Sequence, residues 1–112
     1  MKKHLLFVCT SNSDRGPCAE ALFKKSKKYE SKSVGFWPAE GSTKIIAESV
    51  VWADTIFVMN ESEEGHKTRL LKEFPEAEKK EVIILNISND LCRNDPQLEE
   101  ILRIKLEKEG FL

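Results

Sequence analysis

The sequence LLFVCTSNSDRGP, residues 5–17, joins a buried strand, a polar loop and the start of a helix. Its apolar run, Leu5 to Val8, is typical of a strand that is covered on both faces in a parallel sheet. The loop that follows consists of small and polar residues. Gly16-Pro17 then favours a helix start, because a proline in the first turn gives up no hydrogen bond. A strand that passes through such a loop into a helix predicts an α/β protein.

The same alternation of apolar runs and helical stretches continues along the chain. Further strands are expected at 32–36, 55–59 and 82–85, and helices at 17–23, 42–51, 60–74 and 95–106. Parallel strands linked by helices cross over in a right-handed sense, which places helices on both faces of the sheet. We therefore predict a three-layer α/β/α fold with a four-stranded parallel sheet, flavodoxin-like, in strand order 2-1-3-4. Residues 1–112 are expected to form a single domain.

Composition narrows the possible functions. The 112 residues carry 18 basic and 19 acidic side chains, so the net charge of -1 provides no general attraction to nucleic acid or to an anionic membrane. The apolar runs are far shorter than the roughly 20 residues of a spanning helix. The three cysteines lack the paired spacing of a metal site or a disulfide scaffold. These features predict a cytoplasmic protein with no metal and no cofactor, monomeric or weakly homo-oligomeric, that holds any anion locally.

The loop after the first strand has the composition of an oxyanion site. Cys9 ends the strand, and Arg15 follows five residues later at the helix entrance. Backbone amides between them can surround a tetrahedral anion, and the helix N-terminus adds positive potential. The same field is expected to lower the pKa of Cys9 from about 8.5, while Arg15 offers a planar fork to two phosphate oxygens. The pattern predicts a phosphoryl-transfer site whose binding residues are Thr10, Ser11, Asn12, Ser13 and Asp14.

This segment resembles the low-molecular-weight protein tyrosine phosphatase family, which typically reads V-C-x-x-N-x-x-R-S-P-x-A-E. The matching residues are Val8, Cys9, Asn12, Arg15, Pro17, Ala19 and Glu20. Residues 33–35 resemble the family's S-A-G, and residues 52–59 are similar to its A-D-x-I-x-x-M segment. The resemblance covers most of the chain and is strongest to a short bacterial-type branch.

The resemblance implies a cysteine phosphatase that acts on phosphotyrosine or small aryl phosphates, carried by a phosphorylated protein or a small ester. Cys9 would attack phosphorus to form a phosphocysteine, and Arg15 and the loop amides would hold the phosphoryl oxygens. Asn12 and Ser33 would correspond to residues that shape the loop. No metal is needed for this chemistry.

The chain departs from the family pattern at several positions. Gly16 replaces a hydroxyl residue, and Asp14 stands where many members have a second cysteine. The family's acidic loop after the last strand aligns its first aspartate with Asn89, which leaves Asp90 as the candidate general acid. Asp95 also lies in this loop, but Asp-Pro before an apolar stripe is typical of a helix N-cap.

The aromatic substrate wall of the family is Leu91 in this chain, so Phe36 and Trp37 are the candidate replacements, with Trp37 assigned to substrate binding. Two other functions remain open. An arsenate reductase of the same fold would need further cysteines, for which only Cys18 and Cys92 are present. A catalytically weak relative that binds phosphate or a phosphoprotein would be consistent with Gly16, Asp14 and Asn89.

Overall fold

The computed structural model describes residues 2–91 and 95–112. Its four strands are β1 (Lys3–Cys9), β2 (Tyr29–Gly35), β3 (Thr55–Val58) and β4 (Glu81–Ile84). All of them are parallel, in the order β2-β1-β3-β4. The helices are α1 (Arg15–Leu22), α2 (Ala47–Trp52), α3 (His66–Glu73) and α4 (Pro96–Lys108), with a short 3-10 helix, η1, at Pro75–Lys79. The predicted fold class and strand order are confirmed.

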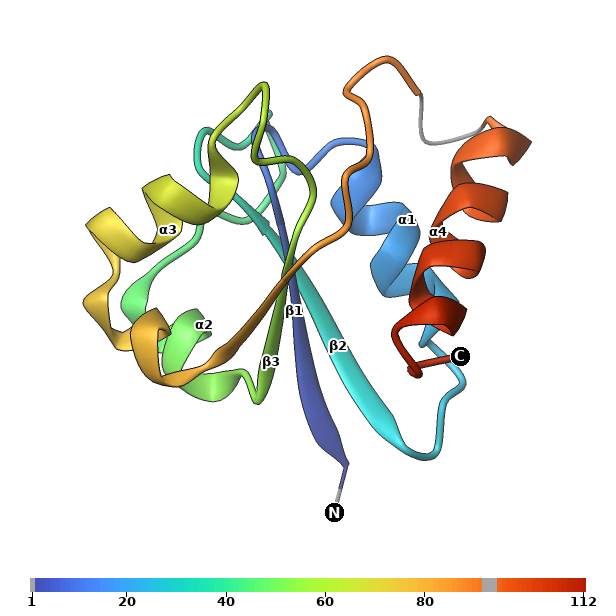
Figure 1. Ribbon diagram of the computed structural model, residues 1–112, viewed down its shortest axis with the longest axis horizontal. Helices are drawn as coiled ribbons and strands as arrows, with labels where there is room; N and C mark the ends of the chain where they lie inside the picture. Colours follow the sequence, from blue (N-terminus) through green and yellow to red (C-terminus); the bar gives the residue numbers. More distant parts are fainter. Residues whose placement is uncertain (1, 92–94) are drawn as a thin grey trace.

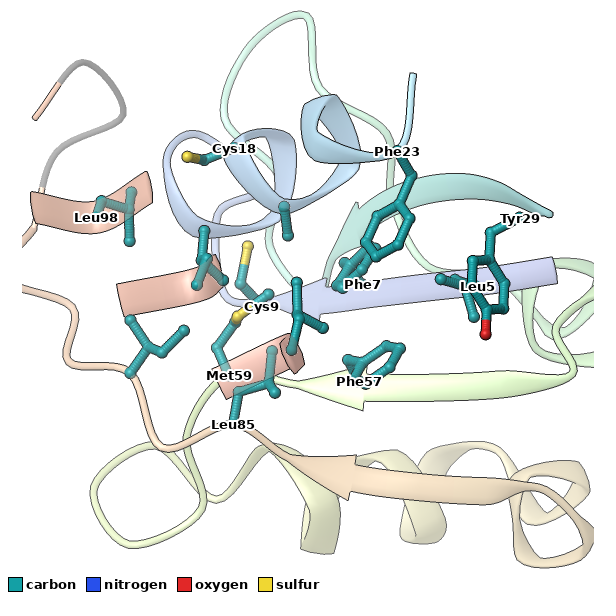
Figure 2. Close-up of a cluster of buried hydrophobic side chains, with 14 residues drawn as sticks. Leu5, Phe7, Cys9, Cys18, Phe23, Tyr29, Phe57, Met59, Leu85 and Leu98 are labelled. Carbon is teal, nitrogen blue, oxygen red and sulfur yellow. The ribbon is translucent and has the colours of Figure 1, made fainter. Parts of the chain in front are cut away.

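Helices cover both faces of the sheet (Figure 1): α1 and α4 lie on one face, and α2 and α3 on the other. The cause is the alternation of side chains along β1. Leu5, Phe7 and Cys9 belong to the cluster under α1 and α4, whereas Leu6 and Val8 belong to the cluster under α2 and α3. Figure 2 shows the first cluster, with Cys9 at the end of β1. Because both faces bury apolar side chains, the strand must be apolar at every position.

Two element boundaries differ from the sequence-based expectation. Strand β2 begins at Tyr29, three residues before the predicted run. Helix α2 begins at Ala47 and not at Ser42, because the chain before it is extended beside the end of β2. There the Gly35 amide donates to the carbonyl of Thr43 at 3.0 Å, and the Ile45 amide donates to the carbonyl of Gly35 at 3.0 Å.

The third helix also starts later than predicted. The Asn60 side chain accepts the amides of Glu63 and Glu64 at 2.8 and 3.2 Å, as a cap does, but it closes only a turn. Gly65 then adopts a left-handed conformation with φ 62°, which interrupts the helical path, and α3 begins at His66. The acidic residues before Gly65, which the sequence predicts to be the first turn of the helix, therefore form a loop after β3.

The last helix agrees with the sequence. The Asp95 carboxylate accepts the Gln97 amide at 2.9 Å as the N-cap of α4. Three leucines on one face of α4, Leu98, Leu102 and Leu106, are fully buried against the sheet. Asp95 therefore has the capping role that its position before Pro96 predicts.

Strand register places three loops at one edge of the sheet. Val8 at the end of β1 pairs with Val34 of β2 and Val58 of β3, and Val58 pairs with Ile84 of β4. Because the strands are parallel and in step, the loops after β1, β3 and β4 open on the same side. Ligands of such sheets bind at this carboxyl edge.

Candidate active site

The loop after β1 folds back on the cysteine that precedes it. Cys9 is 2% exposed, and its sulfur accepts the Asn12 amide at an N–S distance of 3.2 Å. Asn12 has φ 54°, a left-handed conformation that asparagine tolerates better than most residues. Arg15 is the first residue of α1, and it is also buried. The loop thus places a thiol and a guanidinium around one turn of backbone amides.

Two glycines allow the loop to pack this closely. A Cβ at Gly35 would lie 2.7 Å from the carbonyl oxygen of Thr10. The end of β2 can therefore pack against the loop only because Gly35 has no side chain. A Cβ at Gly16 would lie 2.6 Å from Asn12 Oδ1 and 3.2 Å from Cys9 Sγ. Asn12 Oδ1 is buried without a hydrogen-bond partner among the described residues. The family pattern has a hydroxyl residue at the position of Gly16. In this chain, the side-chain amide of Asn12 fills part of the space that such a residue would need.

Asn12 and Ser33 are brought together, as the resemblance implies, but through the backbone of Ser33. Asn12 Nδ2 donates to the Ser33 carbonyl at 3.2 Å. The Ser33 hydroxyl instead donates to Glu20 Oε1 at 2.6 Å, which ties β2 to α1. Together, these two contacts hold the loop against β2 and join β2 to α1.

The electrostatics of Cys9 correct one expectation. Burial raises the pKa of the Cys9 thiol, and Glu64 adds to this effect. Hydrogen bonds from the Gly16 and Asn12 amides and the charge of Arg15 lower the pKa but do not outweigh burial. The expected net lowering of the pKa is therefore wrong for this state of the protein, because the sulfur is enclosed more completely than a strand end suggests.

The Arg15 guanidinium, which follows the loop after β1, is held by groups from two other loops. Nη1 and Nη2 donate to the two carboxylate oxygens of Glu64 at 2.7 and 2.8 Å. Nη1 also donates to the carbonyl of Ile87 at 2.8 Å, and Nη2 to Asn89 Oδ1 at 3.2 Å. The loops after β1, β3 and β4 therefore meet at this one side chain.

Glu64, like His66, is a site residue to which the sequence analysis gave no role. It also accepts the Thr10 hydroxyl at 2.7 Å. Burial raises the pKa of Glu64. Hydrogen bonds from Arg15 and Thr10, together with the positive charge of Arg15, outweigh burial and lower the pKa to about 2. The signal in the sequence is an acidic segment directly after a buried strand, a pattern that also predicts the first turn of a helix.

A buried histidine completes the support of Thr10. His66 Nδ1 accepts the Asn60 amide at 3.1 Å, so a neutral ring carries its proton on Nε2. Nε2 then donates a hydrogen bond to Thr10 Oγ1 at 2.9 Å. The Thr10 hydroxyl in turn donates a hydrogen bond to Glu64 Oε1. Burial lowers the pKa of His66 to about 4, against the opposing charge of Glu64.

The loop after β4 is more exposed. Asn89 contacts Arg15, whereas Asp90 is exposed one residue further on, and its amide donates to Ser88 Oγ at 3.2 Å. Leu91 is partly buried against the cluster under α4. The structure thus brings Asn89 to the arginine and leaves the Asp90 carboxylate in solvent.

The other described residues that the sequence analysis names lie at the rim of the site, in the core or in α1. Trp37 is 62% exposed, its amide donates to the Thr10 carbonyl at 2.8 Å, and the Arg69 guanidinium lies 3.7 Å from its ring centre. Phe36 is instead a core residue. Ser11 and Ser13 share a hydrogen bond of 2.6 Å between their hydroxyls. Asp14 and Cys18 are at the N-cap and in the buried part of α1, and Cys92 lies outside the described residues.

The described residues contain neither a cluster of metal-ligating side chains nor a membrane-spanning helix. Across 2–91 and 95–112, no three His, Cys, Asp or Glu side chains form a group that could hold a metal ion. No helix in the same ranges is both long enough and apolar enough to cross a membrane.

The geometry defines the class of protein. A buried cysteine thiol accepts a backbone amide of a tight loop, and an arginine begins the next helix, a combination of groups suited to nucleophilic phosphoryl transfer. Together with the parallel sheet, this arrangement is that of a phosphomonoesterase that uses cysteine.

Comparison with known proteins identifies the family. No family model matches the chain. The protein-arginine-phosphatase of Geobacillus stearothermophilus is 32% identical over 103 residues, covering 71% of this chain and 68% of that protein. The chain therefore belongs to the low-molecular-weight protein tyrosine phosphatase family, and it is a cysteine phosphatase of that family.

Solved structures show the same fold. The YwlE arginine phosphatase from Geobacillus stearothermophilus superposes with a TM-score of 0.69 at 27% identity, covering 96% of this chain and 93% of that chain. The tyrosine phosphatase Wzb from Escherichia coli K30, in complex with phosphate, gives a TM-score of 0.68 at 22% identity, with 98% and 100% covered. The likeness to Wzb supports the fold alone.

Proposed function

We propose that this protein hydrolyses phosphotyrosine or other aryl phosphate monoesters, in phosphorylated proteins or small esters, through a phosphocysteine at Cys9. The observation that carries the proposal is the loop itself. It directs the Asn12 amide at the Cys9 sulfur and ends in the buried guanidinium of Arg15. Amides and a guanidinium in this arrangement stabilise the charge of a transferring phosphoryl group.

In the first step, the Cys9 sulfur forms a bond to phosphorus while the bond from phosphorus to the leaving oxygen breaks. Because burial keeps the pKa of the Cys9 thiol raised in the unliganded protein, the thiol must first give its proton to a phosphoryl oxygen of the substrate or to solvent. The leaving oxygen takes a proton from a general acid, for which Asp90 is our candidate. A water molecule then attacks phosphorus and releases phosphate, which restores the cysteine.

An exposed aromatic ring beside the loop supports an aryl substrate. Trp37 is fixed to the loop through the Thr10 carbonyl, and one face of its ring is covered by Arg69. An aromatic leaving group could stack against the rest of this surface. Phosphoarginine is the competing substrate class, because a relative at 32% identity is a protein-arginine-phosphatase.

The test is turnover by purified protein of para-nitrophenyl phosphate, a phosphotyrosine peptide and a phosphoarginine peptide. We expect hydrolysis of the aryl esters and none by Cys9→Ser, with Cys18→Ser as the control because it removes the other described thiol. Hydrolysis that persists in Cys9→Ser would refute the mechanism. A strong preference for the phosphoarginine peptide would refute the aryl specificity alone.

A second candidate is a relative that binds phosphate but turns it over slowly. The features that favour it are the raised pKa of Cys9, Gly16 in place of a hydroxyl residue, and Asn89 where the family has an acid. Tight vanadate binding without measurable turnover would support this candidate. Turnover that falls in Asp90→Asn would exclude it.

A further inference from the structure

The Arg15 guanidinium presents two edges to its surroundings. A guanidinium has five N–H donors, and it can hold a pair of oxygens either on the edge between its two terminal nitrogens or on the edge that includes Nε. Glu64 occupies the terminal edge, with both of its oxygens within 2.8 Å of Nη1 and Nη2. Nη1 also donates a hydrogen bond to the Ile87 carbonyl at 2.8 Å, with the N–H group that does not face Glu64.

The second edge is less occupied. Its Nη2 proton meets Asn89 Oδ1 at 3.2 Å, the longest of the four contacts of Arg15, and the Asn89 side chain is exposed. No hydrogen bond from Nε is formed within the described residues. A phosphoryl group can therefore use Nε and Nη2 after displacing a single weak acceptor, while Glu64 stays in place.

Glu64 is itself fixed from several sides. Oε1 accepts the Thr10 hydroxyl at 2.7 Å, and the Glu64 amide donates to Asn60 Oδ1 at 3.2 Å. Its side chain is 18% exposed, against 3% for Arg15. A buried guanidinium without a partner would be strongly unfavourable, so this carboxylate also keeps the cation in the site before substrate arrives.

We propose that Glu64 is a positioning residue for phosphoryl transfer: it holds the terminal edge of Arg15 so that the Nε edge faces the phosphoryl oxygens. The assignment rests on the proposed function of the loop. Glu64 acts through Arg15 and contacts no reacting atom. Asn89 has the opposite role, because its amide oxygen lies on the edge that the phosphoryl group needs.

The experiment compares Glu64→Gln with Glu63→Gln, a matched control on an exposed neighbouring side chain. The measurements are KM and kcat for para-nitrophenyl phosphate, the inhibition constant of inorganic phosphate, and Tm. The glutamine presents an N–H group to Arg15 in place of one oxygen, so KM and the phosphate inhibition constant should rise about tenfold or more. Glu63→Gln should match the wild type.

An unchanged or smaller inhibition constant in Glu64→Gln would overturn the proposal, and a smaller one would mean that Glu64 competes with phosphate. Asn89→Ala should lower the phosphate inhibition constant, and a rise like that of Glu64→Gln would overturn the assignment of the edges. If Glu64→Gln does not fold, Glu64→Asp keeps the charge but shortens the arm. KM should still rise, and a wild-type KM would overturn the proposal.

The failure of this inference is distinguishable from that of the proposed function. Wild-type turnover that depends on Cys9 but is insensitive to Glu64→Gln removes only the positioning role. If the wild type binds phosphate without turnover, equilibrium binding of vanadate replaces KM, and weaker binding by Glu64→Gln still supports the proposal. If the wild type neither binds phosphate nor turns over substrate, both proposals fail.

Discussion

The loop after β1 and the loop after β4 both reach Arg15, but they are held very differently. Cys9, Asn12 and Arg15 of the first loop are at most 5% exposed, and the loop is supported by Gly35 at its back. In the loop after β4, Asn89 and Asp90 are exposed, and a single contact of 3.2 Å joins Asn89 to the arginine. Burial holds the first loop, and in the second it holds Ile87, but Asn89 and Asp90 have few contacts that would oppose a change of position.

This contrast separates the two parts of the reaction. Binding of the phosphoryl group depends on amides and a guanidinium that are fixed before substrate arrives, which is the arrangement that stabilises charge most effectively. In the mechanism that we propose, donation of a proton depends on Asp90, whose loop must come to the leaving group. We therefore expect changes in the first loop to affect binding and folding, and changes in the second to affect kcat.

Among the variants that keep Cys9, the largest effect is expected from Asp90→Asn. Removal of a general acid lowers kcat by about 100-fold for a poor leaving group such as phenol, and much less for para-nitrophenol, which leaves without a proton. The decline of rate on the alkaline side of the pH profile should disappear with the acid. The measurement is kcat for both esters across a pH series.

Asp95→Asn is the control for this prediction, because asparagine caps a helix nearly as well as aspartate and Asp95 caps α4. It should leave kcat and the pH profile unchanged. Loss of the alkaline limb in Asp95→Asn would instead assign the acid to Asp95, and equal effects on both esters would show that Asp90 is not the proton donor.

Gly35→Ala should weaken the first loop. The added methyl would lie 2.7 Å from the Thr10 carbonyl oxygen, a backbone atom that cannot rotate away. We expect a loss of about 1–3 kcal/mol in the free energy of unfolding, typical of overpacking, and a KM raised by about tenfold. Urea titration and steady-state kinetics measure the two effects.

Gly16→Ala is the comparison for Gly35→Ala. Its methyl would meet the end of the Asn12 side chain, at 2.6 Å from Oδ1, and an amide can rotate where a carbonyl of the main chain cannot. It should lower the free energy of unfolding less than Gly35→Ala does. The reverse order would mean that the loop is braced by α1 more than by β2.

The smallest effect concerns stability alone. His66 supports Thr10 as a neutral ring, faced by Glu64, Glu61 and Arg15. Burial lowers its folded pKa from 6.5 to about 4. The unfolded chain therefore binds a proton that the folded one does not, and stability present above pH 6.5 falls on acidification by about 2 kcal/mol down to pH 5.

Urea titrations of the wild type and His66→Gln at several pH values test this contribution. The variant should show a shallower decline of the free energy of unfolding between pH 6.5 and 5, whatever its absolute stability. Equal slopes would show that a protonated imidazole is tolerated beside Thr10.

Most of the fold could be predicted from the sequence because its signals are local. The apolar strands, Pro75 after α3 and the cap at Asp95 were sufficient for the element order and the parallel sheet. Boundaries were wrong where tertiary contacts prevailed. Residues 43–45 are drawn into an extended path beside Gly35, and Gly65 delays α3 despite the capping pattern of Asn60.

Residue spacing alone pointed to candidate site residues only within the first loop. Cys9, Asn12 and Arg15 lie within seven residues, and their spacing is a property of the chain itself. Glu64 and Asn89 are 49 and 74 residues from Arg15 and reach it through strand register. The pKa of Cys9 was also outside the reach of sequence reasoning, because its cause is burial from all sides.

The sequence by itself determined a parallel α/β sheet and a cysteine loop at the end of its first strand, because periodicity, turn residues and short spacings act locally. Only the tertiary structure decided what surrounds that loop. It placed Glu64 on one edge of Arg15, Asn89 on the other and Asp90 in solvent. The physical reason is that parallel strands in register bring distant loops to one edge, where burial and charge set the pKa values.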